Sequence, residues 1–250
     1  MLCLQDVSKN FKNGKKKSVR AVDRLNLTVH PEEFVCIVGR SGCGKTTTLR
    51  MIAGLETVSS GNIRLNGRTI RKPGPDRCVV FQKYTLFPWR TVLSNIAFGP
   101  EMKKMKKAER YVHATRFLDI VGLSGYADAY PGELSGGMQQ RVAVARALAA
   151  DPQILLMDEP FGALDARTRG RLQNELLRIW EKERKTVLFI THSINEAVCL
   201  ADRIVVMHGS RGTVSGIIEN PLARPRDMTG KQAGELIREV SRLLEKDTDE

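Results

Sequence analysis

A glycine-rich stretch near the start of the chain has residue types and spacing suited to holding an anion. Residues 39–46 fit the phosphate-binding loop pattern G-x-x-x-x-G-K-[ST]. Glycines let successive backbone N–H groups point at one anion, Lys45 adds a full positive charge, and the Thr46 hydroxyl can ligate Mg²⁺. The stretch predicts a nucleoside triphosphate ligand. The predicted binding residues are Gly39, Arg40, Ser41, Gly42, Cys43, Gly44, Lys45, Thr46 and Thr47.

Two adjacent acids, Asp158 and Glu159, end the apolar run 154–157. Ligands of α/β sheets meet the carboxyl ends of strands. A carboxylate at such a strand end suits Mg²⁺, which favours Asp158, and Glu159 can accept a proton from an attacking water. Adjacent acids are usually surface charge, but the four apolar residues before them argue for a strand end here.

Gln82 and His192 follow two further apolar runs, 78–81 and 186–191. An amide at the first position can reach Mg²⁺ or a water, although Gln82 alone would be a weak indication. A lone histidine is more often structural than catalytic. His192 nevertheless occupies the same kind of strand end as Gln82 and Asp158.

Ser135, Gly136 and Gly137 open a predicted helix, which we place at 142–150. A Ser-Gly-Gly turn at a helix start is a second anion-binding geometry. The alternative is that Ser135 only caps the helix.

These groups require strands and helices to position them. We predict a strand at 34–38, a helix at 46–53 closed by Gly54, and N-terminal strands at 2–7, 19–22 and 25–29 that form an antiparallel sheet. A turn-prone stretch around 10–14 separates the first two. Phe11 lies there and either stacks on a nucleobase or plugs the core under a loop. Further strands are predicted at 61–67, 78–81, 154–158, 186–191, 203–207 and 212–218, and further helices at 106–121, 164–181 and from 229.

Bulk composition excludes several classes of protein. The chain has 250 residues, 42% of them hydrophobic, which suits one α/β domain. No apolar run approaches the roughly 18 residues of a membrane span, and residues 1–6 carry no export signal, so we expect a cytoplasmic protein. The net charge is +12. Its lysine-rich runs are not interleaved with aromatics, which favours solvated surface over nucleic-acid binding and leaves anionic lipid as a second interpretation.

Taken together, the motifs resemble those of ABC-transporter ATP-binding subunits along most of the chain. The phosphate loop, Gln82, the Leu-Ser-Gly-Gly signature at 134–137, the acidic strand 154–159, the loop 161–165 and His192 follow in the order of that family. The Ser-Gly-Gly signature is the specific element, because other phosphate-loop ATPases lack it.

The resemblance implies an α/β P-loop (RecA-like) ATPase core with an N-terminal antiparallel β subdomain and an inserted α-helical subdomain. We expect one domain over 1–250, with the insertion at about 88–150. It also implies an ATP hydrolase that uses Mg²⁺ held by Thr46, Gln82 and Asp158, with Glu159 as general base and His192 and Gln82 in catalysis. Two copies would pair head to tail, so that Ser135, Gly136, Gly137 and Asp165 complete the site that holds ATP, with Phe11 on the adenine.

The segment 87–96 and the closing segment 221–227 resemble importers of the nitrate, sulfonate and taurine group. The resemblance implies two membrane permease subunits and, indirectly, a periplasmic or lipoprotein substrate-binding protein as partners, with the chain on the cytoplasmic face of a bacterial inner membrane. We expect no nucleic-acid partner. Importers of pyrimidine precursors remain open, as does a soluble ABC ATPase that acts on nucleic acid. A small-molecule kinase would not need the Ser-Gly-Gly turn.

Overall fold

A computed structural model describes residues 1–13, 17–82, 85–162, 165–209 and 211–245 of the protein. The chain divides into two compact units. The first unit joins Met1–Gly74 to Thr186–Glu250, and the second is Pro75–Lys185. Each unit is described separately below.

The first unit contains an antiparallel sheet in the strand order β2-β1-β4-β5. Its strands are β1 (Leu2–Asn13), β2 (Lys17–Val29), β4 (Ser60–Leu65) and β5 (Arg68–Thr69). The predicted turn around 10–14 is wrong in part, because β1 continues through Phe11 to Asn13 and pairs with β2 along that length. The two short strands predicted at 19–22 and 25–29 are one strand. Cross-strand pairing therefore overrides the local turn preference of Asn10.

The same unit holds a second set of paired strands in the order β10-β9-β3-β8. β3 (Phe34–Gly39) is parallel to both β8 (Thr186–Thr191) and β9 (Arg203–His208), and β10 (Thr213–Glu219) is antiparallel to β9. Every residue of β3 and β8 is buried, as expected of parallel strands covered on both faces.

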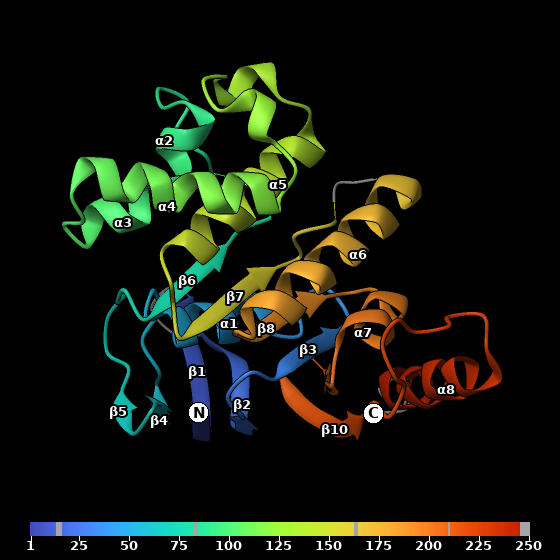
Figure 1. Cartoon of the computed structure of the whole chain (residues 1–250). Coiled ribbons are helices and arrows are strands. Elements are labelled where there is room, and N and C mark those ends of the chain that lie inside the picture. The colour runs from blue at the N-terminus through green and yellow to red at the C-terminus, as the bar shows by residue number, and fades with distance from the viewer. Residues whose placement is uncertain (14–16, 83–84, 163–164, 210, 246–250) are drawn as a thin grey trace. The chain divides into compact units, whose positions relative to one another are not determined.

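The described residues of this unit form the helices α1 (Lys45–Ala53), α7 (Ile194–Leu200) and α8 (Lys231–Glu245). The predicted amphipathic C-terminal helix is confirmed as α8, which buries Ala233, Leu236 and Val240 and packs against α7, β9 and β10 (Figure 1). The predicted fraying after Asp247 lies outside the described residues.

The second unit places two parallel strands, β6 (Arg77–Val80) and β7 (Ile154–Asp158), beside a group of helices. The helices are α2 (Val92–Ile96), α3 (Phe98–Met102), α4 (Lys107–Ile120), α5 (Gly136–Ala149) and α6 (Ala166–Glu183), with 3₁₀ turns η1 (Ser124–Tyr126) and η2 (Pro131–Glu133). Helices α2, α3 and α4 each contact α5 (Figure 1). The prediction that this helix starts at 142 is wrong, because Ser135 caps it and both signature glycines are helical.

One buried amide organises the aromatic segment before α2. Asn95 is fully buried, and its Nδ2 donates to the backbone oxygens of Phe87, Arg90 and Thr91 at 3.1, 3.0 and 3.0 Å. Its Oδ1 accepts from the Phe87 N–H at 2.9 Å. The Asn95 amide group has two hydrogens, so one of them is shared between two of the three carbonyl oxygens. Together the contacts fix the backbone that carries Trp89.

Within the described ranges, no helix has both the length and the apolar character needed to cross a membrane.

Candidate functional site

The phosphate-binding loop joins β3 to α1, as predicted from the sequence. Gly42 and Gly44 have φ of +84° and +90°. A Cβ on Gly44 would lie 2.3 Å from the Ala21 carbonyl oxygen of β2. Both the left-handed backbone and the close approach therefore require glycine at position 44. The result is a helix start whose backbone N–H groups are available to an anion.

Lys45 lies inside this loop. Its side chain is 5% exposed, and its Nζ donates to the carbonyl oxygens of Gly39 and Arg40 at 2.8 and 2.9 Å. Neutral carbonyls hold the ammonium in place without cancelling its charge, and the first turn of α1 contains no acid. The loop therefore offers a full positive charge together with a helix N-terminus.

The strand register places His192 beside the start of the loop. Val38 pairs with Thr191 in the parallel ladder of β3 and β8. The next residues on the two strands are Gly39 and His192, so the histidine follows the strand end from which the loop departs. Its side chain is exposed. The first unit thus brings His192 close to the phosphate-binding loop, and both were predicted from the sequence.

Phe11 is the predicted adenine-stacking residue. It pairs with Val19 on β2, two residues before Ala21, whose carbonyl touches Gly44. Two strand residues span about 7 Å, so Phe11 lies on the part of the sheet next to the loop. The ring is 40% exposed, and the Lys9 ammonium lies 4.9 Å from its centroid. The ring is therefore accessible but already has a cation on it, and adenine stacking stays a prediction.

The second unit brings Gln82 and Glu159 together. Val80 pairs with Met157 in the parallel ladder of β6 and β7, and Gln82 and Glu159 each lie two residues further along. A Cβ built on Gly162 would be 3.4 Å from the Gln82 Nε2 and 3.8 Å from a Glu159 carboxylate oxygen. Glu159 has φ +44°, an uncommon conformation for a residue with a side chain. Such backbone strain clusters at functional sites.

Three oxygen donors were predicted for Mg²⁺. Asp158 is the last residue of β7 and belongs with Gln82 to the second unit, whereas Thr46 belongs to the first. A carboxylate, an amide and a hydroxyl fit Mg²⁺, which takes hard oxygen ligands and is usually held by one or two carboxylates plus phosphates. No cluster of three His, Cys, Asp or Glu side chains occurs among the residues that the structure describes. A magnesium site built from one carboxylate, one amide and one hydroxyl does not require such a cluster.

The signature turn and the start of α6 also lie side by side in the second unit. Ser135 caps α5 by accepting from the Met138 N–H at 3.4 Å. A Cβ on Gly137 would be 3.5 Å from the Thr168 methyl group. The Thr168 N–H donates to Asp165 at 3.0 Å, and this bond and the Thr168 side chain lower the pKa of Asp165. Ala163 and Leu164 of the predicted 161–165 loop lie outside the described residues.

Comparison with known proteins decides the family. The sequence profile described as ABC transporter matches residues 22–162. The chain belongs to the ABC transporter family. The cassette is 53% identical over 244 residues to an uncharacterized ABC transporter ATP-binding protein of Methanocaldococcus jannaschii, covering 97% of this chain and 91% of that one.

Several relatives of this cassette have names that mention a substrate, either nitrate or bicarbonate. The nitrate import ATP-binding protein NrtD of Synechocystis is 50% identical over 201 residues, 80% of this chain and 76% of that protein. The bicarbonate transport ATP-binding protein CmpD of Synechocystis is 46% identical over 229 residues, 90% of this chain and 81% of that protein.

A solved ATP-binding cassette, dimeric and bound to ADP and Pi in a post-hydrolysis state, is 34% identical and superposes with a TM-score of 0.76. The match covers 88% of this cassette and 98% of the solved chain. The predicted P-loop ATPase fold is confirmed, and so is the assignment of the cassette as an ATP hydrolase coupled to transport. The roles of individual site residues stay predictions.

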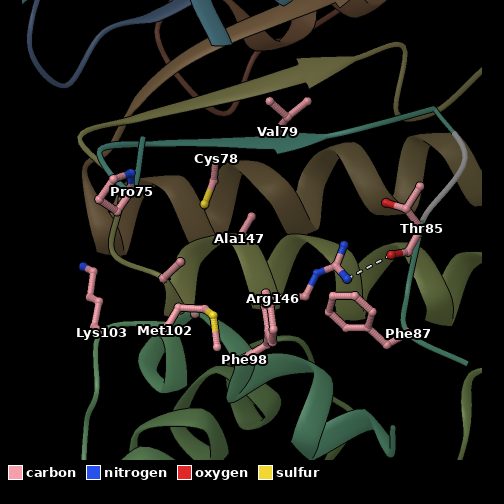
Figure 2. Close-up of a pocket in the computed structure, with 12 residues that line it drawn as sticks. Pro75, Cys78, Val79, Thr85, Phe87, Phe98, Met102, Lys103, Arg146 and Ala147 are labelled. Carbon is pink, nitrogen blue, oxygen red and sulfur yellow. Dashed lines mark hydrogen bonds between the residues drawn. The ribbon is translucent and has the colours of Figure 1, made fainter. Parts of the chain in front are cut away.

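Sequence reasoning missed one feature of the cassette, a cavity of about 560 Å³ inside the second unit (Figure 2). Figure 2 shows Cys78 and Val79 of β6 on one side, Phe98 and Met102 on the other, and Arg146 of α5 between them. Its walls come from separate segments of the chain, so no local pattern could have indicated it. The exposed indole of Trp89 packs 5.7 Å from Phe87, another wall residue.

Arg146 is the unusual member of this cavity. Its guanidinium donates to the Thr85 carbonyl at 2.9 Å and lies 5.3 Å from the centroid of Phe87. Burial lowers the pKa of Arg146. Within the described part of the chain, no carboxylate forms an ion pair with it. The cavity therefore combines an apolar lining with a partly buried cation.

Proposed function

We propose that this cassette powers the import of a small inorganic anion through a pair of membrane permease subunits. The names of the nitrate and bicarbonate relatives support that class of substrate. Sulfonate and taurine, predicted from the sequence, have no support from these names. The chain would sit on the cytoplasmic face of a bacterial inner membrane, and a substrate-binding protein outside the membrane would deliver the anion.

The proposed mechanism assigns each half of the site a task. Lys45 and the loop N–H groups bind the β- and γ-phosphates of ATP. Thr46, Gln82 and Asp158 would hold Mg²⁺, which would supply positive charge to the phosphates. Glu159 takes a proton from the attacking water, and His192 contacts the γ-phosphate.

A second copy of the chain completes the site. Ser135, Gly136 and Gly137 of that copy bind the same ATP from the opposite side, with Asp165 at the contact. When a two-fold axis relates the two copies, the phosphate loop of one copy and the signature turn of the other bind the same nucleotide. The dimer then holds two nucleotides. The dimeric state of the solved cassette supports this arrangement. We treat residues 1–250 as one ATP-binding domain with a helical insertion at about 88–150.

The import proposal is tested with the cassette and its permease pair in proteoliposomes, supplied with ATP inside and with the substrate-binding protein outside. We expect uptake of labelled nitrate or bicarbonate that stops when ATP is omitted. Taurine and a pyrimidine precursor serve as competitors. Uptake of the pyrimidine alone would contradict the anion class. Absence of any uptake, together with salt-sensitive DNA binding, would favour the soluble ATPase that the sequence left open.

The cavity supports a specific docking site for the permease. Its apolar walls suit a hydrophobic side chain, and Arg146 favours an acidic partner, because charge-assisted hydrogen bonds are stronger than the bond to the neutral Thr85 carbonyl. Trp89, 72% exposed at the same segment, provides a large apolar contact. The occupant is a cytoplasmic segment of the permease that carries a carboxylate beside an apolar residue.

Arg146→Glu should weaken permease binding at least tenfold, because it places like charges opposite each other. Basal ATP hydrolysis by the isolated cassette should stay unchanged, since Arg146 is outside the nucleotide site. Co-purification and a binding titration with the permease pair measure the effect. Arg178→Glu, the same charge change on the exposed face of α6, is the matched control. Equal permease affinity for the two variants would reject this docking site.

A further inference from the structure

The turn that carries His192 is held on both sides by one hydroxyl group. The Thr191 Oγ1 accepts from the Ser193 N–H at 2.9 Å and donates to the Glu196 carboxylate at 2.5 Å. Thr191 and Glu196 are buried, 1% and 5% exposed, whereas the histidine between them in the chain is exposed. The exposed residue therefore sits on a buried support.

This support is a variant of a known helix start. Ser193 is the N-cap of α7, and its Oγ accepts from the Glu196 N–H at 3.3 Å. In an ordinary S-x-x-E capping box the acid accepts directly from the N-cap N–H. Here the Thr191 hydroxyl bridges the Ser193 N–H and the Glu196 carboxylate. It therefore joins the last residue of β8 to the first turn of α7. The spacing Ser193-x-x-Glu196 is the one sequence signal that could have indicated this support.

Hydrogen-bond chemistry fixes the direction of both bonds. An amide N–H only donates, so the Thr191 hydroxyl accepts from Ser193, and its own hydrogen donates to the Glu196 carboxylate. The bond from the Ser193 N–H closes residues 191–193 into a small ring, and the bond to Glu196 holds the Thr191 hydroxyl in place. The Glu196 carboxylate thereby supports the turn that carries His192.

A buried carboxylate is costly unless its hydrogen bonds are used. Ser193 alone already caps α7, so an apolar side chain at position 196 would provide a helix start at lower cost. The Glu196 carboxylate makes a contact that Ser193 cannot make, to the residue immediately before the histidine. Its position thus favours a role in placing the turn over a role in starting the helix.

We infer that Glu196 is a positioning residue for ATP hydrolysis, acting through the Thr191 hydroxyl on His192. The inference rests on the proposed function, in which His192 contacts the γ-phosphate. The β3–β8 register places this turn beside Gly39 of the phosphate loop. A small rotation of the turn therefore moves the imidazole relative to the bound phosphates, and such misplacement lowers the rate of a reaction more than it lowers substrate affinity.

The test compares two substitutions of Thr191 in the full chain. Thr191→Val keeps the shape of the side chain and removes the hydroxyl, whereas Thr191→Ser keeps the hydroxyl. We expect Thr191→Val and Glu196→Ala to lower kcat about tenfold with little change in KM for ATP. Thr191→Ser and Glu196→Gln, which preserve the donor and acceptor, should stay within about twofold of the parent. Thermal melting and fluorescent-nucleotide binding show that each variant is folded.

A double-mutant cycle separates positioning from general support of the fold. In a His192→Ala background, Thr191→Val should cause no further loss in single-turnover hydrolysis, because the residue it positions is gone. A further tenfold loss in that background would overturn the inference.

The same measurements distinguish failure of the inference from failure of the proposed function. If His192→Ala lowers turnover and Thr191→Val does not, the inference alone is wrong. If His192→Ala leaves turnover unchanged, the proposed role of His192 is wrong and the inference falls with it.

Discussion

Glu159→Gln should reduce ATP turnover by about 10²- to 10³-fold while leaving ATP binding intact. The amide has the shape of the carboxylate but cannot accept a proton from the attacking water. Glu159 lies at the end of β7, near Gln82 and Gly162, so the substitution leaves the phosphate loop untouched. Steady-state hydrolysis and fluorescent-nucleotide titration measure the two quantities.

The same variant should accumulate as a dimer when ATP and Mg²⁺ are present, because the nucleotide that joins the copies is no longer consumed. Size-exclusion chromatography with light scattering checks this expectation. Adding Ser135→Arg should return the variant to a monomer, since a bulky side chain at the signature obstructs the second copy. Glu181→Gln, an exposed glutamate of α6, is the matched control. Normal turnover by Glu159→Gln would remove Glu159 as the general base.

Lys45→Ala should lower both ATP affinity and turnover by roughly 100-fold or more, the scale of losing a preorganised electrostatic group. Lys45 Nζ is held by the carbonyls of Gly39 and Arg40. Binding of ATP replaces these neutral acceptors with phosphate oxygens, which interact more strongly with an ammonium. The stability of the nucleotide-free chain should change little, because the bonds that are lost go to neutral acceptors, two carbonyls and the Cys43 sulfur.

Nucleotide titration, hydrolysis and thermal melting of Lys45→Ala test this expectation, with Lys12→Ala, an exposed lysine of β1, as control. ATP should raise the melting temperature of the parent and of Lys12→Ala but not of Lys45→Ala. Equal ATP-dependent stabilisation of all three proteins would show that Lys45 does not bind phosphate.

The sequence predicted best those features that depend on local pattern. Strand β8 and the phosphate loop were located within one or two residues, because apolar runs and glycine spacing are local signals. The end of β1 was not located, because pairing with β2 decides whether the chain around Asn10 forms a turn or continues as a strand. The start of α5 was misplaced because the two signature glycines, poor helix formers, are stabilised by the Ser135 cap.

The site shows the same distinction between residues that a local pattern indicates and contacts that join distant segments. His192 and Gln82 were found as polar residues after apolar strands, and the register then supplied their neighbours. The dependence of the His192 turn on Glu196 escaped detection, because it rests on a hydroxyl that joins two elements. The cavity around Arg146 escaped for a similar reason, since segments distant in sequence build it.

The four hydrogen bonds of Asn95 have a mechanical consequence. They tie the segment that carries Trp89 to helix α2, so a displacement of that segment would be coupled to α2. Helix α2 rests on α5, whose first turn is the Ser-Gly-Gly signature. A force applied by a docked protein would thereby reach the residues that we propose contact ATP in the opposite copy.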